Sequence, residues 1–255
     1  MTNATQSLKI DVTSDMLCPF CLLGLKQLEL AITRYREQNP QPLDINIRIH
    51  PFQLNNMLTD EPESREEWAV RKFGPEQAIA LRSCLNDKFA TVGLPEIVSG
   101  GQLSSSHHAQ RITEYAGHIR PEAQLPLVME LCEATHIEGT APSDKDVLAR
   151  VSTKHGLFSS EEEAREWLDS NAYDIEVRKA YQNAQKQGIT GVPFFVFQDK
   201  YAASGAMGVD EFVNIIGEIF KREKDSSPQP LMVVGDQCDI HDQCNSAEFH
   251  PERVL

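Results

Sequence analysis

The first sixty residues pass from a short apolar run to a long amphipathic segment and back to an apolar run. Leu8 to Val12 predicts a strand. The stretch after it repeats apolar residues at helical spacing and ends before Asn39-Pro40, which predicts a helix. Isoleucines at every second position then predict a strand from Ile45 to Ile49. Such a strand–helix–strand unit has parallel strands and a right-handed crossover, so an α/β sheet begins here.

The middle of the chain, roughly residues 64 to 187, has helical periodicity interrupted by glycines. No internal repeat is evident in it. The predicted helices are Arg65–Lys72, Glu76–Phe89, His107–Ala116, Ala123–Thr135, Lys145–His155, Glu161–Leu168 and Tyr173–Lys186.

Strands return after this helical stretch. Phe194–Phe197 and Tyr201–Ser204 flank a tight turn, which predicts a hairpin. A final helix places five apolar residues on one face: Phe212, Ile215, Ile216, Ile219 and Phe220.

The order of elements predicts one α/β fold, β-α-β followed by β-β-α, interrupted by a large all-helical insertion. Residues 1–60 and 188–222 form a discontinuous domain, 61–187 the insertion and 223–255 a polar tail. Neither half of the sheet covers its own apolar face, so the two halves are expected to fold together.

Composition narrows the class of protein. The chain is 40% hydrophobic and 24% charged, which is typical of a soluble globular protein. Its net charge of -14 argues against nucleic acid and anionic membrane surfaces as partners. Without a basic region and an apolar run near residue 1, we expect a cytoplasmic protein. Six cysteines in 255 residues are too few for a disulfide scaffold.

The motif with the clearest chemistry is Cys18-Pro19-Phe20-Cys21, between the first strand and the first helix. Free N–H groups and the helix dipole at a helix start favour a thiolate, the form that attacks disulfides. Pro19 suits the first helical position, and Cys21 lies one turn on, within reach of Cys18. The alternatives are half of a zinc site or two core cysteines; no second CxxC is present to complete a zinc site.

A second motif, Thr190-Gly191-Val192-Pro193, directly precedes the predicted strand at Phe194. Sterics alone permit a proline at the start of a strand. The alternative is a cis Val192–Pro193 bond beside the cysteines, where backbone groups of Val192 would hold an extended substrate chain.

These motifs together resemble the DsbA family of thioredoxin-fold proteins, and within it the cytosolic FrnE-like branch. Further matching segments are residues 50–55, 108–112, 188–196 and 201–206. The resemblance implies a thioredoxin fold and a thiol–disulfide oxidoreductase or isomerase. Cys18 would be the nucleophile, Cys21 the resolving thiol and Pro193 the cis proline, with Pro19, Phe20 and Val192 at the substrate. Many FrnE-like sequences have Trp where Phe20 stands, so the direction of electron flow stays open.

The tail carries a second pair, Cys238 and Cys244. Three interpretations are open: silent exposed thiols, zinc bound with His241 and His250, or a second redox pair that exchanges with Cys18 and Cys21, which the FrnE resemblance supports. The remaining cysteines, Cys84 and Cys132, lie in predicted helices and are interpreted as core residues.

Two other functions remain alternatives to disulfide exchange. Relatives such as the kappa glutathione transferases and hydroxychromene-carboxylate isomerases share this fold but have serine where Cys18 stands, which suggests glutathione-dependent transfer or isomerisation. The other alternative is a partner-binding, chaperone-like module with a zinc-pinned tail. For the leading hypothesis we expect thiol or disulfide substrates, no metal at the CxxC site and no cofactor other than glutathione as a co-substrate.

Overall fold

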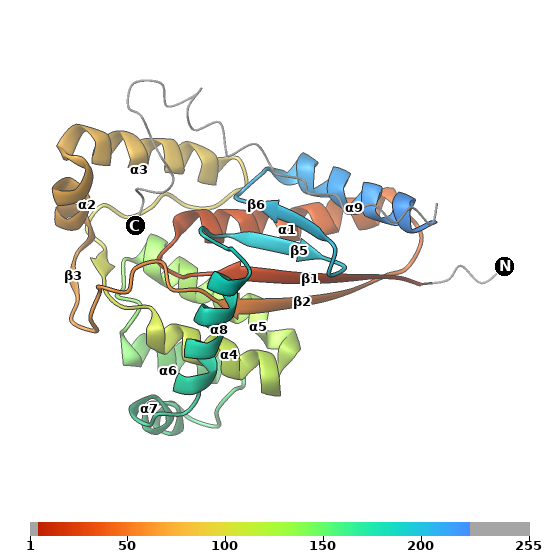
Figure 1. The fold of residues 1–255 in the computed structure, drawn as a ribbon. Helices are drawn as coiled ribbons and strands as arrows, with labels where there is room; N and C mark the ends of the chain where they lie inside the picture. Colours follow the sequence, from red (N-terminus) through yellow and green to blue (C-terminus); the bar gives the residue numbers. More distant parts are fainter. Residues whose placement is uncertain (1–4, 225–255) are drawn as a thin grey trace.

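The computed structural model describes residues 5–224, and its centre is a four-stranded sheet in the order β2-β1-β5-β6 (Figure 1). β1 (Gln6–Ser14) pairs in parallel with β2 (Leu43–Pro51). On its other side β1 pairs antiparallel with β5 (Phe194–Phe197), which forms a hairpin with β6 (Tyr201–Ser204). Strands from both ends of the chain therefore build one sheet.

One face of the sheet is covered by α1 (Pro19–Gln38) and α9 (Val209–Lys224), which run side by side (Figure 1). Their contact includes Tyr35 and Phe220, whose ring centroids are 5.9 Å apart. The apolar face of α9 predicted from the sequence packs into this core, with Phe212 against Phe195 of β5 at 4.9 Å. Burial of these aromatic rings is a large part of what holds α9 on the sheet.

The insertion lies between β2 and β5 and is helical apart from one short ladder. Its helices are α2 (Arg65–Phe73), α3 (Pro75–Ala90), α4 (His107–Ile119), α5 (Pro121–Glu133), α6 (Lys145–Lys154), α7 (Glu161–Asp169) and α8 (Asp174–Lys186), with a π-helical turn over Ala134–Glu138. The ladder pairs β3 (Glu63–Ser64) with β4 (Gln102–Leu103). The expectation of an all-helical insertion is corrected in this detail, because two-residue strands leave no periodic signal in a sequence.

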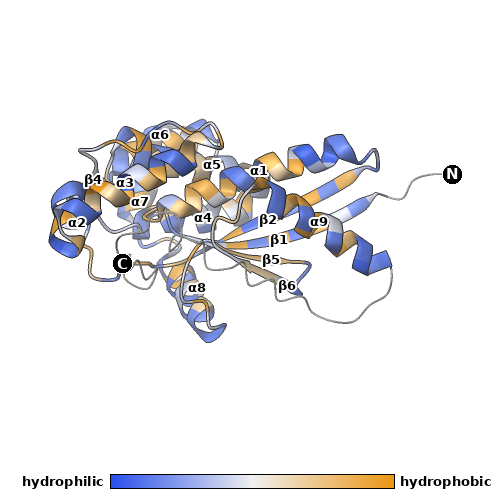
Figure 2. Ribbon diagram, turned by 90° about the horizontal axis from the view of Figure 1, so that it is seen from above, coloured by the Kyte–Doolittle hydropathy of each residue, from blue (hydrophilic) through white to orange (hydrophobic). Residues whose placement is uncertain are grey.

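Several of these helices start where the sequence offers a capping side chain. Ser64 accepts from the Glu67 N–H at the start of α2, and Ser160 accepts from Glu163 at the start of α7. Each cap satisfies one of the free N–H groups of a helix start. In Figure 2 the turns of α2 and the end of α9 are largely hydrophilic, whereas α1, α4 and α5 carry hydrophobic residues.

Two glutamines attach the insertion to the sheet. Gln124 of α5 accepts from the Ile49 N–H at 2.9 Å and donates to the Ile49 carbonyl at 2.9 Å, so it pairs with β2 as another strand would. Gln110 of α4 donates to the carbonyls of Ser14 and Phe52, at 3.1 and 3.0 Å. The end of β1, where the CxxC motif follows, is thereby joined to the insertion.

The predicted order of elements is confirmed: β-α-β, a helical insertion and β-β-α, with all four strands in one mixed sheet. The domain limits at residues 60, 188 and 222 stay a prediction. Within residues 5–224 no helix is both long and apolar enough to cross a membrane.

Candidate active site

Cys18 and Cys21 lie on the first turn of α1, just beyond the end of β1. Cys18 is the residue that caps the helix, and Pro19 takes the first helical position. The Cys21 N–H donates to the Cys18 carbonyl at 2.9 Å. Cys18 is 4% exposed and Cys21 is fully buried, so Cys18 is the only one of the two with any surface for an incoming sulfur.

The loop before β5 meets Cys18 from the other end of the chain. The Val192–Pro193 peptide bond is cis, and the Cys18 thiol donates to the Val192 carbonyl at a Sγ–O distance of 3.4 Å. Pro193 is buried, whereas Val192 is half-buried and packs beside Phe52 and Ile189. Of the two interpretations of Pro193, the cis bond beside the cysteines is confirmed.

The approach of α1 to this loop depends on a glycine that sequence reasoning did not single out. A Cβ at Gly24 would lie 2.9 Å from Cγ of Pro193 and 3.3 Å from Phe195. The first distance is shorter than carbon atoms tolerate, so glycine at this position lets α1 and Pro193 pack in contact. Its signal in the sequence is a glycine in the middle of an otherwise strong helix.

Burial separates the two cysteines chemically. It raises the pKa of the Cys21 thiol well above its usual value, and the neighbouring Cys18 adds to that rise. The Ser14 side chain and the Asp15 backbone oppose the rise but do not outweigh burial. Cys21 is therefore a thiol at neutral pH.

Asp15 is the site residue that the sequence analysis missed. It is fully buried; Oδ1 accepts from the Leu17 N–H at 3.1 Å and Oδ2 from the Leu54 N–H at 2.8 Å. Burial raises its pKa, although hydrogen bonds from Leu54, Ser106 and Leu17 act in the opposite sense. The signal for Asp15 in the sequence was an acidic residue at the end of an apolar strand, three residues before Cys18.

Pro19 and Phe20, which the sequence analysis placed at the substrate, differ in what their side chains contact. Pro19 is half-buried and lines a cavity together with Leu17. Phe20 is half-buried and packs against the core around α1. Pro19 follows Cys18 directly and Phe20 is the next residue, and a contact of either side chain with a substrate stays a prediction.

Other candidates from the sequence lie away from this site or outside the described residues. Cys132 is fully buried in the core, as expected, whereas Cys84 is only half-buried, so its interpretation as a core residue is corrected. The tail residues Cys238, His241, Cys244 and His250 lie outside the described residues. Among residues 5–224, no group of three or more His, Cys, Asp or Glu is arranged to hold a metal ion.

Comparison with protein-family models now adds to this geometry. Residues 9–217 match the model of the DSBA-like thioredoxin domain. The chain belongs to this family. The resemblance to DsbA proteins is thereby confirmed, and the FrnE-like branch stays a prediction. A search of curated proteins finds no match.

Solved structures of the DSBA-like family and its relatives share the fold. The chain is 24% identical to a probable DsbA oxidoreductase, SCO1869 from Streptomyces coelicolor, with a TM-score of 0.69 over 89% of this chain and 94% of that one. It is 20% identical to a 2-hydroxychromene-2-carboxylate isomerase, with a TM-score of 0.62 over 86% and 99%. Cytosolic disulfide reductase DsbM from Pseudomonas aeruginosa, solved with GSH, is 14% identical with a TM-score of 0.51 over 84% and 99%. At these identities the likeness concerns the fold alone.

Proposed function

We propose that this DSBA-like protein is a thiol–disulfide oxidoreductase that works through Cys18 and Cys21. The observation that carries the proposal is the placement of the Cys18 sulfur. It lies at the start of α1, with the Val192 carbonyl 3.4 Å away and the buried Cys21 thiol one turn behind it. A nucleophile, a resolving thiol and a backbone edge for the substrate are thus collected at one point.

The reaction proceeds in two exchanges. The Cys18 thiolate attacks one sulfur of a substrate disulfide, forms a mixed disulfide and releases the other substrate sulfur as a thiolate, which takes a proton. Cys21 then loses its proton and attacks the Cys18 sulfur, which releases the second substrate thiol and leaves a Cys18–Cys21 disulfide. The substrate gains two electrons and the protein loses two; the reverse sequence oxidises a dithiol substrate.

Single serine variants test this assignment. We expect Cys18→Ser to abolish disulfide reduction, because the nucleophile is lost. Cys21→Ser should instead accumulate a mixed disulfide with the substrate, which non-reducing electrophoresis and mass spectrometry would detect. Disulfide reductase activity unimpaired by Cys18→Ser would sink the proposal.

A second candidate is glutathione-dependent isomerisation or transfer. The structural likeness to a 2-hydroxychromene-2-carboxylate isomerase favours it. It needs one activated thiol and no resolving partner. Full isomerase or transferase turnover by Cys21→Ser with glutathione as co-substrate would move this candidate ahead of disulfide exchange.

Three further points belong to the same proposal. Glutathione is a suitable electron donor or co-substrate, and the likeness to a disulfide reductase solved with GSH supports this choice. That reductase is cytosolic, which supports a cytoplasmic location for this protein. The substrates are thiols or disulfides of proteins or small molecules. Disulfide exchange between the Cys18–Cys21 pair and the tail pair, Cys238 and Cys244, stays a prediction. Replacement of both tail cysteines by serine tests it. We expect the oxidised Cys18–Cys21 pair to return to the dithiol more slowly in this variant.

A further inference from the structure

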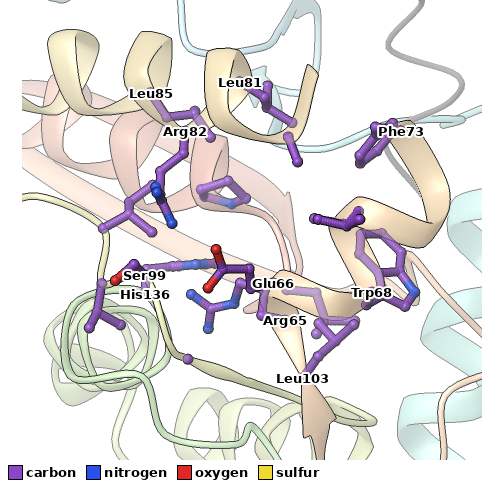
Figure 3. A pocket seen from close by; sticks show the side chains of 18 of the residues that line it. Arg65, Glu66, Trp68, Phe73, Leu81, Arg82, Leu85, Ser99, Leu103 and His136 are labelled. Carbon is purple, nitrogen blue, oxygen red and sulfur yellow. The ribbon is translucent and has the colours of Figure 1, made fainter. Parts of the chain in front are cut away.

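Ser14, the last residue of β1, carries a buried hydroxyl without a hydrogen-bond partner among the described residues. Two other buried atoms without a partner there, Nη1 of Arg65 and Nε2 of His136, belong to residues that line the cavity in Figure 3. The Ser14 hydroxyl instead acts on the resolving thiol, Cys21. A buried polar atom without a partner calls for an explanation, and a role in the reaction is one.

Hydrogen bonds of the backbone hold this hydroxyl in place. The Ser14 carbonyl accepts from the Phe52 N–H and from Nε2 of Gln110, both at 3.1 Å. The carbonyl of the next residue, Asp15, accepts from the Cys18 N–H at 3.0 Å and so ties the start of α1 to the end of β1. The hydroxyl and the first turn of α1 are therefore fixed relative to each other before any sulfur reacts.

The surroundings of Cys21 combine burial with neutral hydrogen-bond donors. Of the groups that oppose the effect of burial on the pKa of Cys21, the Ser14 hydroxyl acts most strongly and the Asp15 N–H next. Both favour a thiolate as hydrogen-bond donors, without a positive charge. The other titratable groups around the pair are the Cys18 thiol, which raises the pKa of Cys21, and two groups whose own pKa burial raises, the Asp15 carboxyl and the Cys132 thiol of α5.

We propose that Ser14 is a catalytic residue of the second exchange, in which its hydroxyl donates a hydrogen bond to the Cys21 thiolate as this attacks Cys18. The inference rests on the proposed oxidoreductase function and adds the group that enables a buried thiol to act as a nucleophile. A donor that lacks a partner in the resting state and gains one as charge develops lowers the barrier of that step.

The step balances with solvent as the proton acceptor. The Cys21 thiol gives its proton to a water molecule, and the Cys21 sulfur forms a bond to the Cys18 sulfur. The bond between Cys18 and the substrate sulfur breaks, and its electron pair leaves with the substrate thiolate, which takes up a proton. The Ser14 hydroxyl keeps its own proton throughout, and its hydrogen bond exists only while Cys21 is charged.

Removal of the hydroxyl has a calculable effect on the rate. Loss of one hydrogen bond to a charged sulfur should lower the thiolate fraction of Cys21 at least about tenfold at neutral pH. A thiolate of higher pKa is a better nucleophile, which offsets up to about half of this factor on a logarithmic scale. We therefore expect Ser14→Ala to slow the second exchange at least about threefold.

Glutathione disulfide tests this with the full-length reduced protein. Samples are quenched in acid at successive times, and peptide mass spectrometry separates the Cys18–glutathione adduct from the Cys18–Cys21 disulfide. In Ser14→Ala the adduct should form at the wild-type rate and convert to the disulfide at least about threefold more slowly. The redox midpoint of the pair should stay unchanged, because neither the Cys21 thiol nor the disulfide uses this hydrogen bond.

Ser152→Ala is the matched control, because Ser152 is buried on α6 and its hydroxyl donates to the Ala149 carbonyl. It should leave both exchange rates unchanged. Urea unfolding separates a catalytic from a structural role. Ser14→Ala should unfold at the same urea concentration as the wild type or a higher one, since it removes an unpaired buried group, whereas Ser152→Ala should unfold at a lower one.

The outcomes distinguish this inference from the proposed function. Conversion of the adduct at the wild-type rate in Ser14→Ala would overturn the inference and leave the redox function standing. Loss of stability in Ser14→Ala, with slower formation of the adduct as well, would show that the hydroxyl supports the fold and would also overturn the inference. A wild type that never forms the Cys18–Cys21 disulfide would overturn both.

Discussion

Asp15 holds together the two loops that surround the cysteines. Its carboxyl oxygens accept from Leu17, one residue before Cys18, and from Leu54 in the loop after β2. Because the group is fully buried, its charged form is costly and its pKa is raised. The same residue therefore positions the residue that precedes Cys18 and makes stability depend on pH.

The sign of that dependence follows from the direction of the shift. The unfolded protein loses the Asp15 proton near its usual value of 3.8, whereas the folded protein keeps it to higher pH. The folded state thus binds more protons in this interval, so the contribution of Asp15 to stability is full below pH 3.8 and is lost as pH rises through the folded pKa. In Asp15→Asn this loss is absent.

We expect urea unfolding to report the difference. Between pH 4 and pH 7 the free energy of unfolding of the wild type should fall relative to that of Asp15→Asn. At pH 4 the variant should be the less stable by about 1–3 kcal/mol, since an amide nitrogen cannot accept one of the two N–H groups. A constant difference across the pH range would show that Asp15 does not titrate as described.

At the scale of elements, α1 packs closely against Pro193, the residue after Val192, at Gly24. Gly24→Ala should destabilise the protein by about 1–3 kcal/mol, because the new methyl group meets the rigid proline ring. Gly217→Ala on α9 is the matched control. Its Cβ finds only Tyr35, at 3.9 Å, so this substitution should be neutral or stabilise the helix by up to about 1 kcal/mol. Thermal unfolding of both variants measures the contrast; equal effects would refute the close packing at Gly24.

The second prediction for the elements concerns the hydrogen bonds by which α5 docks on the edge of β2. Gln124→Ala removes the partner of the Ile49 N–H and of the carbonyls of Ile49 and Thr113. We expect a loss of roughly 3 kcal/mol, since each buried group left unpaired costs about 1–3 kcal/mol. Gln182→Ala, exposed on α8, should stay within about 0.5 kcal/mol of the wild type in the same urea titration. A small effect at Gln124 would mean that the insertion is held mainly by its apolar contacts.

At the scale of the whole molecule, local features could be predicted from the sequence, whereas hydrogen bonds between residues far apart in the chain could not. The strands, the helix starts and the spacing of the CPFC and GVP motifs are local patterns, and the sheet and site follow them. Asp15 and Leu54 are 39 residues apart, and Gln124 and Ile49 are 75 apart. Periodicity does not reveal the partner of a buried polar residue, so the roles of Asp15 and Gln124 emerge only from the fold.

The measurement that tests the account most directly is a redox titration of the full chain in glutathione buffers. Samples are quenched with a thiol alkylator, and peptide mass spectrometry reports which cysteines are paired at each poise. We predict a Cys18–Cys21 disulfide with a defined midpoint, which also gives the direction of electron flow. Cys18 that stays alkylatable at every poise, or that carries only glutathione, would contradict the dithiol mechanism.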